Sequence, residues 1–229
     1  MKLKNAYINV LFLSTTLLII SSCSTKKKSW VNRQYHNTTA KYNGYFNGNK
    51  SINSGIKKLH TNHIDDYTTV ISVFPTGDLK KAKKASSQMD RAIRKASVVI
   101  QRHSMKIKGK EYCRWIDDSY LMLGKAYFYK GDFDESIKTF NFIKNEYSDS
   151  EIRFKAALWL VRGYVEKGDF ASAEIELKGL LQDKLLPDKL GKKLSVVAAD
   201  FYVQKKDFRN AKTELLNATS LIKRKKKQG

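Results

Sequence analysis

The chain has 229 residues and a formal net charge of +22, from 44 Lys and Arg against 22 Asp and Glu. This length is enough for one or two domains with a sizeable core, and a content of 2 prolines favours helices over a turn-rich sheet protein. The 2 cysteines, Cys23 and Cys113, exclude a framework of several disulfides.

The first 22 residues have the features of a lipoprotein signal peptide. A basic start is followed by an apolar stretch over residues 10–20, which is too short for a comfortable transmembrane helix. Residues 20–23 then read Ile-Ser-Ser-Cys, the branched, small, small, cysteine order that lipoprotein processing requires. We therefore expect Cys23 to carry acyl chains that anchor the mature protein, and Ser24, in place of an Asp, favours the periplasmic face of the outer membrane. The alternative is an ordinary secretory signal or membrane helix with an incidental cysteine.

An exported chain does not routinely meet nucleic acid, so the positive charge is not expected to serve DNA or RNA binding. Anionic lipid headgroups, cell-wall polymers and acidic proteins are the expected counterparts. With Cys23 lipidated, Cys113 has no partner for a structural disulfide. Composition and repeats divide the chain into a signal peptide (1–22), a lipidated tether (23–32), an N-terminal helical region (33–110), a repeat region (111–222) and a basic tail (223–229).

The helical region begins with two apolar patterns at helical spacing, one in residues 35–46 and one in residues 52–59 (Tyr35, Thr39, Tyr42, Phe46; Ile52, Ile56, Leu59). These patterns predict two short helices separated near Gly48 and Asn49. Residues 65–75 are predicted to form an extended connector that packs through three apolar side chains (Val70, Val73, Phe74).

A long helix is predicted next, capped by Asp78 and ended by Gly109. Its buried seam is expected to contain residues that recur every three or four positions (Leu79, Ala82, Ser86, Met89, Ile93, Ala96, Ile100, His103). The opposite face carries cations that either meet solvent or bind an acidic partner (Lys80, Lys81, Lys84, Arg91, Lys95, Arg102).

Three copies of one pattern fill the repeat region. Each copy runs from a Tyr to a Phe and contains Lys and Asp at matching positions, and the copies are spaced by 37 and then 38 residues (Tyr127 to Phe133, Tyr164 to Phe170, Tyr202 to Phe208). A small residue stands three positions after each Phe, and an apolar residue stands four positions after that (Ser136, Ala173, Ala211; Phe140, Leu177, Leu215). The pattern resembles the tetratricopeptide repeat, in which helices A and B pack antiparallel. We therefore predict an all-α protein in which an N-terminal helical region precedes a tetratricopeptide α-solenoid of about three repeats.

The turn between helices A and B is well marked in the first two copies. Gly131 is expected to end the first helix A in the left-handed conformation, and Asp132 with Glu135 has the spacing of a capping box for helix B. The third copy has Lys206 where the first two have glycine.

Small residues are expected where the two helices of a repeat cross. In the first repeat Gly124 lets the backbones approach at Ser136. Helix A of this repeat is expected to begin upstream, through Tyr112 and Trp115.

Stacked repeats leave a concave groove lined by the A helices. The register places a mixture of aromatic, basic and other residues there (Asp118, Leu121, Lys125, Phe128, Tyr129; Lys155, Leu158, Arg162; Lys193, Val196, Asp200). Aromatic and basic side chains together suit a peptide or an acidic segment of a partner protein. The alternative is that these residues pack on neighbouring helices.

No residue pattern indicates an enzyme. His60 and His63 stand near Asp65 and Asp66, but a third metal ligand at characteristic spacing is lacking, so a surface or capping role is expected. Cys113 has no identifiable base beside it. Because nucleophile, phosphate-loop and dinucleotide motifs are also missing from the sequence, we expect no catalytic residue, metal or cofactor.

Four long strings together resemble the PorW/SprE family of lipoproteins: CSTKKKSWVNRQYHNTTAKYNGYFNGN, DDYTTVISVFPTGD, QMDRAIRKASVVIQRHSM and KGKEYCRWIDDSYLMLGKAYFYKGDF. These are tetratricopeptide-repeat proteins of the type IX secretion and gliding-motility machinery of Bacteroidota. The resemblance implies an outer-membrane lipoprotein that assembles or couples the secretion apparatus and contacts its periplasmic components.

Members of that family are longer, with more repeats downstream, whereas this chain stops at Gly229. The third helix B would then expose its far side, and we expect either a fragment or a short paralogue whose end is covered by a partner. The leading hypothesis is a non-enzymatic scaffold, and the alternative is a basic periplasmic lipoprotein that binds the cell wall or another anionic polymer.

Overall fold

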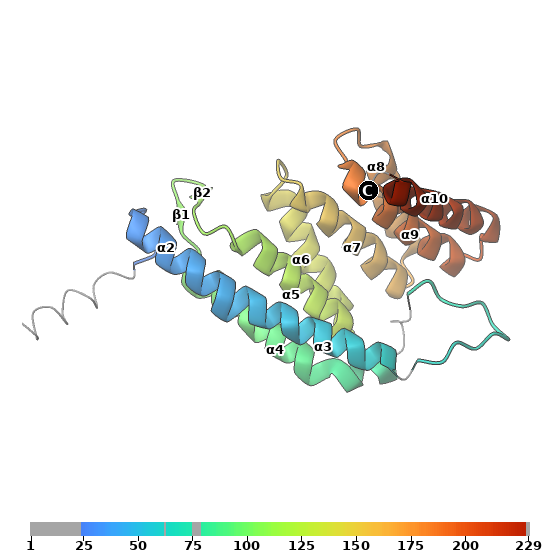
Figure 1. Ribbon diagram of the computed structural model, residues 1–229, viewed down its shortest axis with the longest axis horizontal. Coiled ribbons are helices and arrows are strands. Elements are labelled where there is room, and N and C mark those ends of the chain that lie inside the picture. The colour runs from blue at the N-terminus through green and yellow to red at the C-terminus, as the bar shows by residue number, and fades with distance from the viewer. Residues whose placement is uncertain (1–23, 62, 75–78, 228–229) are drawn as a thin grey trace, which may run out of the picture.

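The computed structural model describes residues 24–61, 63–74 and 79–227, and this part of the chain is almost entirely helical (Figure 1). It confirms the predicted all-α helical repeat solenoid. Three predictions fall outside the described residues: the signal peptide, the lipidation of Cys23 and the cap at Asp78. None of the helices in the described ranges is both long enough and apolar enough to cross a membrane.

The N-terminal region begins with one long helical run rather than two separate helices. It consists of α2 (Trp30–Thr39), the π-helical segment η1 (Ala40–Phe46) and α3 (Asn47–Thr61), which follow one another without a break. The predicted separation near Gly48 and Asn49 is therefore wrong. Glycine stands at residue 48 because the helix approaches its neighbour closely there: a Cβ atom on Gly48 would lie 2.6 Å from the Met122 side chain.

The buried face of this helical run is also different from the expected one. Its buried residues are mostly small or polar (Asn32, His36, Ala40, Gly44, Gly48, Ser51, Ile52, Gly55, Leu59). The aromatic side chains of Tyr35, Tyr42 and Phe46, which fall at helical spacing, are exposed instead. Buried positions recur every four residues through most of the run, and the wider turns of the π-helical segment keep them on one face.

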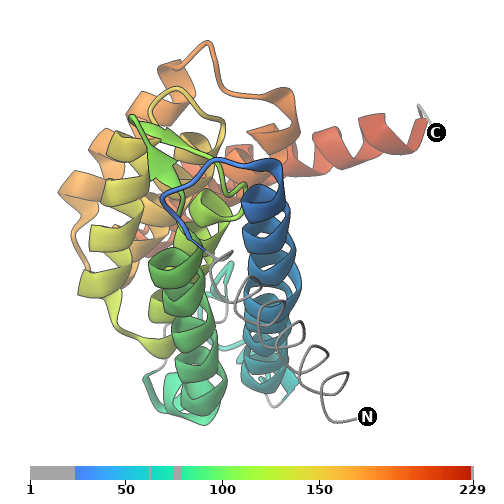
Figure 2. The same ribbon diagram turned by 90° about the vertical axis from the view of Figure 1, so that its left-hand side faces the viewer.

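Helix α4 (Leu79–His103) packs antiparallel against this run, as Figure 2 shows for the two long helices standing side by side. Its buried seam contains Ala82, Met89, Ala96 and His103 as predicted, together with other residues that the prediction missed (Ala85, Ala92, Val99). Ser86, Ile93 and Ile100 are only half-buried, so the seam is rotated from the predicted stripe.

The long helix ends at His103, not at Gly109. A small hairpin follows, with strand β1 (Lys106–Ile107) paired to strand β2 (Lys110–Glu111). Lys108 and Gly109 form its two-residue turn with φ of 51° and 78°, the left-handed geometry that such hairpins favour. Gly109 is thus a hairpin residue.

Six helices form the three repeats, and the core lies between them. The pairs of A and B helices are α5 (Ile116–Lys130) with α6 (Phe133–Glu146), α7 (Ile152–Glu166) with α8 (Phe170–Gln182), and α9 (Asp188–Gln204) with α10 (Phe208–Lys227). Helix α5 begins at Ile116, so Tyr112 and Trp115 precede it and the predicted upstream start is wrong. Bulky buried side chains such as Phe140, Leu177 and Phe201 fill the interior.

The predicted crossing and turn residues of the repeats have their expected roles. The Ser136 hydroxyl donates a hydrogen bond to the Gly124 carbonyl at 2.9 Å, and a Cβ atom on Gly124 would lie 2.5 Å from the Phe140 ring. Gly131 ends α5 with φ 90°, as predicted. In the third repeat Lys206 occupies the same left-handed region with φ 62°.

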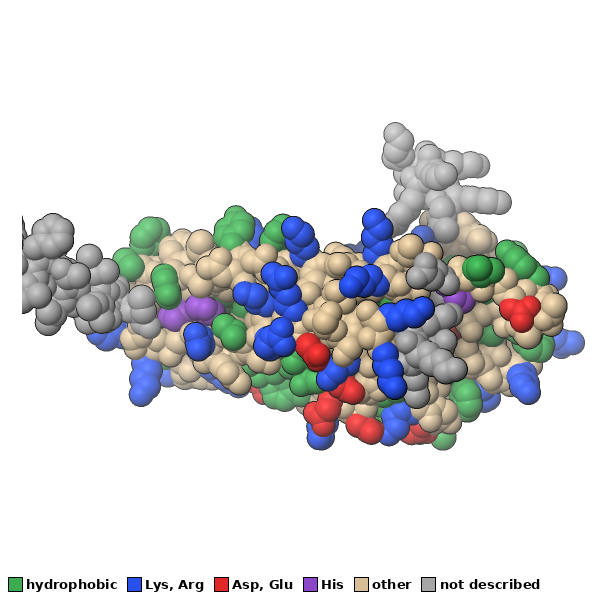
Figure 3. Space-filling model, turned by 90° about the horizontal axis from the view of Figure 1, so that it is seen from below, with side chains coloured by type: hydrophobic (Ala, Val, Ile, Leu, Met, Phe, Trp, Pro, Cys, Tyr) green, Lys and Arg blue, Asp and Glu red, His purple; other side chains and the backbone are tan. Residues whose placement is uncertain are grey.

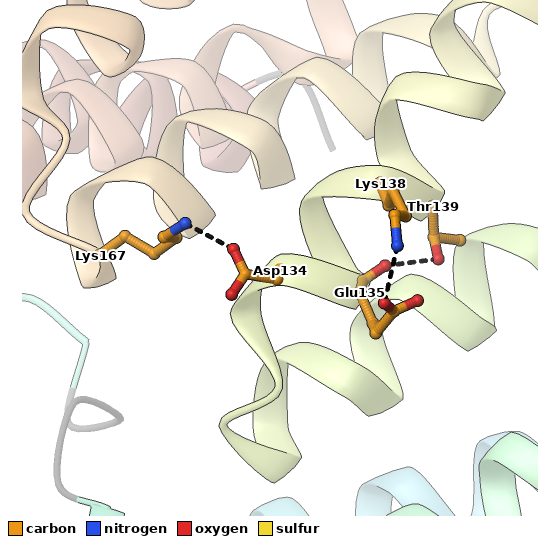
Figure 4. Close-up of polar contacts among 5 residues, drawn as sticks. All are labelled: Asp134, Glu135, Lys138, Thr139 and Lys167. Atoms are coloured by element: carbon orange, nitrogen blue, oxygen red, sulfur yellow. Dashed lines mark hydrogen bonds and ion pairs between the residues drawn. The ribbon is translucent and has the colours of Figure 1, made fainter.

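The capping box predicted for Asp132 and Glu135 does not form. The Asp132 carboxylate pairs with Lys130 at 3.0 Å, and the Glu135 carboxylate accepts a bond from Lys138 at 2.9 Å (Figure 4). Figure 4 also shows the neighbouring Asp134 reaching Lys167 in the next repeat. The acids at this turn therefore bind lysines rather than free backbone N–H groups.

The outer face of the third repeat is open, as expected for its helix B. The counterparts of Leu215 in the first two repeats, Phe140 and Leu177, are 0% and 1% exposed, whereas Leu215 itself is 42% exposed. Phe208 is also half-exposed, unlike its partly buried counterparts Phe133 and Phe170. Within the described residues no further helix packs on the outer side of α10.

Candidate partner-binding groove

The A helices α5, α7 and α9 lie next to one another and form the concave side of the solenoid (Figure 1). A hollow of about 300 Å³ opens on this side. Its walls combine apolar residues with five cations (Phe74, Leu121, Leu158, Trp159, Leu190, Val196, Val197; Lys125, Lys155, Arg162, Lys192, Lys193). We refer to this hollow as the groove.

Most of the residues predicted to face the groove line it, including Lys125, Lys155, Arg162 and Lys193. Four others do not (Asp118, Phe128, Tyr129, Asp200). Phe128 is buried beneath the groove, where its ring meets the Trp159 ring at a centroid distance of 5.1 Å. For Phe128, the alternative of packing between helices is therefore the correct one.

Arg162 is the most enclosed cation of the groove, with 7% of its surface exposed. Its guanidinium lies against three aromatic rings, 3.8 Å from the Phe74 centroid, 4.3 Å from Trp159 and 4.7 Å from Phe128. The buried Nη2 atom has no hydrogen-bond partner among the described residues. An unsatisfied buried donor costs about 1–3 kcal/mol and more when charged, and the three aromatic rings offset part of that cost for Arg162.

The lysines of the groove add positive charge, which Asp117 and Asp118 at the start of α5 offset only in part. Lys125, Lys155 and Lys193 make no ion pair with another described residue. Burial, followed by repulsion from Lys193 and Lys155, lowers the pKa of Lys125 to about 8. Its ammonium also lies 5.6 Å from the centroid of the Trp159 ring. A negative ligand would relieve this repulsion.

Asp200 lies behind the groove and is 4% exposed. Burial raises the pKa of its carboxyl group to about 7, although the charge of Arg162 acts in the opposite direction. The Phe74 N–H donates a hydrogen bond to this carboxylate. This bond holds the end of the connector at the groove, whereas Val70 of the same connector is 59% exposed and does not pack as predicted.

Sequence reasoning missed two aromatic members of the groove. Trp159 lies one turn from both Lys155 and Arg162 on α7, so helical spacing could have found it. Phe74 was predicted to pack, but nothing in the sequence indicated its target, because it reaches α7 and α9 from a connector distant in the chain.

Elsewhere, the described residues offer little that resembles catalytic chemistry. The His36 and His103 rings meet at 2.9 Å between their Nδ1 atoms, a buried pair that the sequence did not reveal. His63 bonds Asp65 at 2.9 Å, and no group of three potential metal ligands occurs in the described ranges. Burial raises the pKa of the Cys113 thiol to about 11, so this thiol remains protonated at neutral pH.

The stacked helix pairs and the groove define a helical-repeat protein of the type that binds other proteins. Residues 117–141, which cover most of α5 and the first part of α6, match the family model of the tetratricopeptide repeat. The chain is therefore a tetratricopeptide-repeat-containing protein, and such repeats typically act as non-enzymatic interaction scaffolds. No curated protein sequence matches the chain.

Proposed function

We propose that this protein is a non-enzymatic scaffold whose groove binds an acidic segment of a protein partner. The proposal includes a lipid anchor at Cys23, on the periplasmic face of the outer membrane, and a role in type IX secretion and gliding motility. The lipobox and the four strings that resemble the PorW/SprE family support this setting.

The positive charge of the groove carries the proposal. Five cations line one hollow, the Arg162 Nη2 has no acceptor among the residues that the structure describes, and burial with repulsion lowers the pKa of Lys125. Such an arrangement is costly without a ligand and is relieved by carboxylate groups, which accept strong charge-assisted hydrogen bonds. The apolar walls add a second requirement, so the expected segment has acidic residues beside at least one apolar residue.

Trp159 provides a direct reporter for the groove. A fluorescein-labelled synthetic peptide of alternating Glu and Leu is titrated into the protein while the tryptophan emission and the peptide anisotropy are recorded. We expect saturable binding that changes the Trp159 emission and weakens as salt is added. Trp159→Phe should remove the emission change while leaving the anisotropy change.

Charge reversal in the groove tests whether its cations hold the peptide. Lys125→Glu together with Lys155→Glu should abolish binding. The matched control is Lys212→Glu together with Lys57→Glu, because both lysines are exposed and lie outside the groove. Equal binding by the two double variants would contradict the proposal.

The cellular role is tested by deleting the gene and measuring protein secretion and colony spreading. Normal secretion and spreading would reject the assignment to type IX secretion. Affinity capture with the groove double variant as control then identifies which partners depend on the groove.

A second candidate function, binding of the cell wall or another anionic polymer, is favoured by the net charge of +22. Pull-down on purified peptidoglycan in rising salt distinguishes it. Equal retention of the groove double variant and its control would favour the polymer-binding function, because non-specific attraction to a polymer depends on the total charge of the protein.

A further inference from the structure

A row of exposed apolar side chains runs along α2 and η1. Val31, Tyr35, Tyr42 and Phe46 are between 45% and 60% exposed, and Trp30 beside them is 67% exposed. They are spaced by four or seven residues, which places them on one face of the helical run. The opposite face is packed against α4, so the row is turned away from the core.

A second hollow, of about 500 Å³, adjoins this row between α2, η1 and residues 112–115. It is lined by the cations Arg33, Lys41 and Arg114 and by four aromatic side chains (Trp30, Tyr42, Tyr112, Trp115), and no acidic residue lines it. The three cations make no ion pair with other described residues. We refer to this hollow, together with the apolar row, as the aromatic-basic face.

The walls of the hollow are held in place by hydrogen bonds. The Asn37 side chain donates to the Tyr112 carbonyl at 3.1 Å and accepts from the Arg114 N–H at 2.8 Å. The Lys41 ammonium lies 4.9 Å from the Tyr42 ring centroid and 5.6 Å from that of Trp115. The cations and rings are therefore already arranged around the space that a ligand would enter.

Basic side chains predominate on the aromatic-basic face, and the nearby acids Glu111 and Asp117 line a separate hollow on the other side of Arg114. Lys26, Lys27 and Lys28 are exposed immediately before α2. Seen from below, Lys and Arg side chains are spread along the molecule, while most acidic side chains lie away from the end that carries α2 (Figure 3). Basic residues of this kind are attracted to anionic lipids by about 1 kcal/mol each, and Trp and Tyr concentrate where a bilayer meets water.

We infer that the aromatic-basic face lies on the membrane surface and that its hollow holds the phosphate group of an anionic phospholipid. This inference rests on the proposed anchor, since Cys23 stands seven residues before Trp30 and would bring the face to a bilayer. None of the residues that line the hollow lines the groove, so lipid and protein partner bind at separate places. The protein is then docked on the bilayer rather than suspended from its tether.

Trp30 itself reports on this contact. The full-length processed protein is reconstituted into vesicles of phosphatidylethanolamine and phosphatidylglycerol whose acyl chains are brominated, since bromine quenches nearby tryptophan. We expect quenching that disappears in Trp30→Phe and persists in Trp159→Phe. The inference would be overturned if the vesicles did not quench the protein at all, or if quenching persisted in both variants.

Charge reversal tests the phosphate site. Arg33→Glu, Lys41→Glu and Arg114→Glu together should abolish the Trp30 quenching on these vesicles. The matched control, Lys57→Glu, Lys83→Glu and Lys212→Glu, has the same net charge and changes exposed lysines elsewhere. Equal quenching in the two triple variants would show that no specific phosphate site exists.

Two further readings separate this inference from the proposed function. Mass spectrometry of the N-terminal peptide shows whether Cys23 is lipidated, so a missing anchor is recognised independently of the quenching. A change of Trp30 emission with the Glu–Leu peptide but not with vesicles would instead assign the face to a protein partner and overturn the lipid inference.

Discussion

The seam between the helical run (η1 and α3) and α4 differs from the interior of the repeats in how its helices pack. In the seam, Ala40, Gly44 and Gly48 face α4, so the backbones approach closely and the large side chains of the run point outward. In the repeats, Phe140 and Phe201 fill the space between helices. Both regions are closely packed. We therefore expect added atoms to lower the stability of the protein when they are placed in the seam, and removed atoms to lower it when they are taken from the repeat interior.

The largest expected effect is in the repeat interior. Phe140→Ala removes a ring that is 0% exposed, and we expect a loss of about 3–5 kcal/mol in the free energy of unfolding. Phe142→Ala is the control on the same helix, because Phe142 is 41% exposed and mainly meets the Tyr120 ring; its cost should be about 1 kcal/mol. Urea denaturation of both variants measures the difference, and similar losses would contradict this view of the interior.

In the seam, a single added methyl group should also destabilise the protein. A Cβ atom on Gly44 would lie 2.0 Å from Val99 Cγ2, so Gly44→Ala should destabilise the protein by about 1–3 kcal/mol. Gly179→Ala is the matched control, since nothing lies within 4 Å of its added Cβ and alanine favours a helix by about 1 kcal/mol over glycine. Thermal unfolding should move in opposite directions for the two variants; a shift in the same direction would reject the close-packed seam.

The two regions should also respond differently to pH, because the groove belongs to the repeats alone. As pH rises past about 7, Asp200 gains a negative charge, and past about 8 Lys125 loses its positive one. Both changes make the groove less positive, so binding of the Glu–Leu peptide should weaken between pH 6 and pH 9, by up to about tenfold for each pH unit above the pKa of Lys125 in the free protein.

Anisotropy titrations across this pH range measure that loss. Lys125→Arg keeps the charge and should flatten the upper part of the curve, while Asp200→Asn should flatten the part near neutral pH. A profile unchanged in both variants would show that other groups control it.

The smallest effect concerns the turn that distinguishes the third repeat from the other two. Lys206 has φ 62°, where the corresponding Gly131 and Gly168 have φ 90° and 74°. Because left-handed geometry is unfavourable for a residue with a side chain, Lys206→Gly should stabilise the protein by about 1 kcal/mol. Lys205→Gly, at a residue with φ −73°, should not stabilise it, and denaturation midpoints compare the two.

The sequence predicted the repeats well because their signals are local. Gly131 and the pair Gly124 and Ser136 stand at fixed positions around one turn, and the same register placed Lys125 and Arg162 in the groove. The groove cations lie on three helices, and four of the five were found from their positions in their own repeats, whereas Lys192 was not predicted.

The N-terminal region was predicted less well because its packing depends on residues far apart in the chain. Aromatic residues at helical spacing normally mark a buried face, but in this region the close approach to α4 requires small residues, and Tyr42 and Phe46 are left outside. The contacts of Phe74 and of the His36–His103 pair join segments far apart in the chain, so no local pattern could show them.

The continuity of α2, η1 and α3 determines how the molecule would bear a mechanical load. A pull on the residues before Trp30 is applied at the N-terminal end of this run, which packs antiparallel along α4 (Figure 2). The contacts of the run with α4 extend from His36 beside His103 to Gly55 beside Met89, and α4 in turn packs on α5. The run and α4 therefore share such a load along their whole length and connect the N-terminal end of the described chain to the repeats.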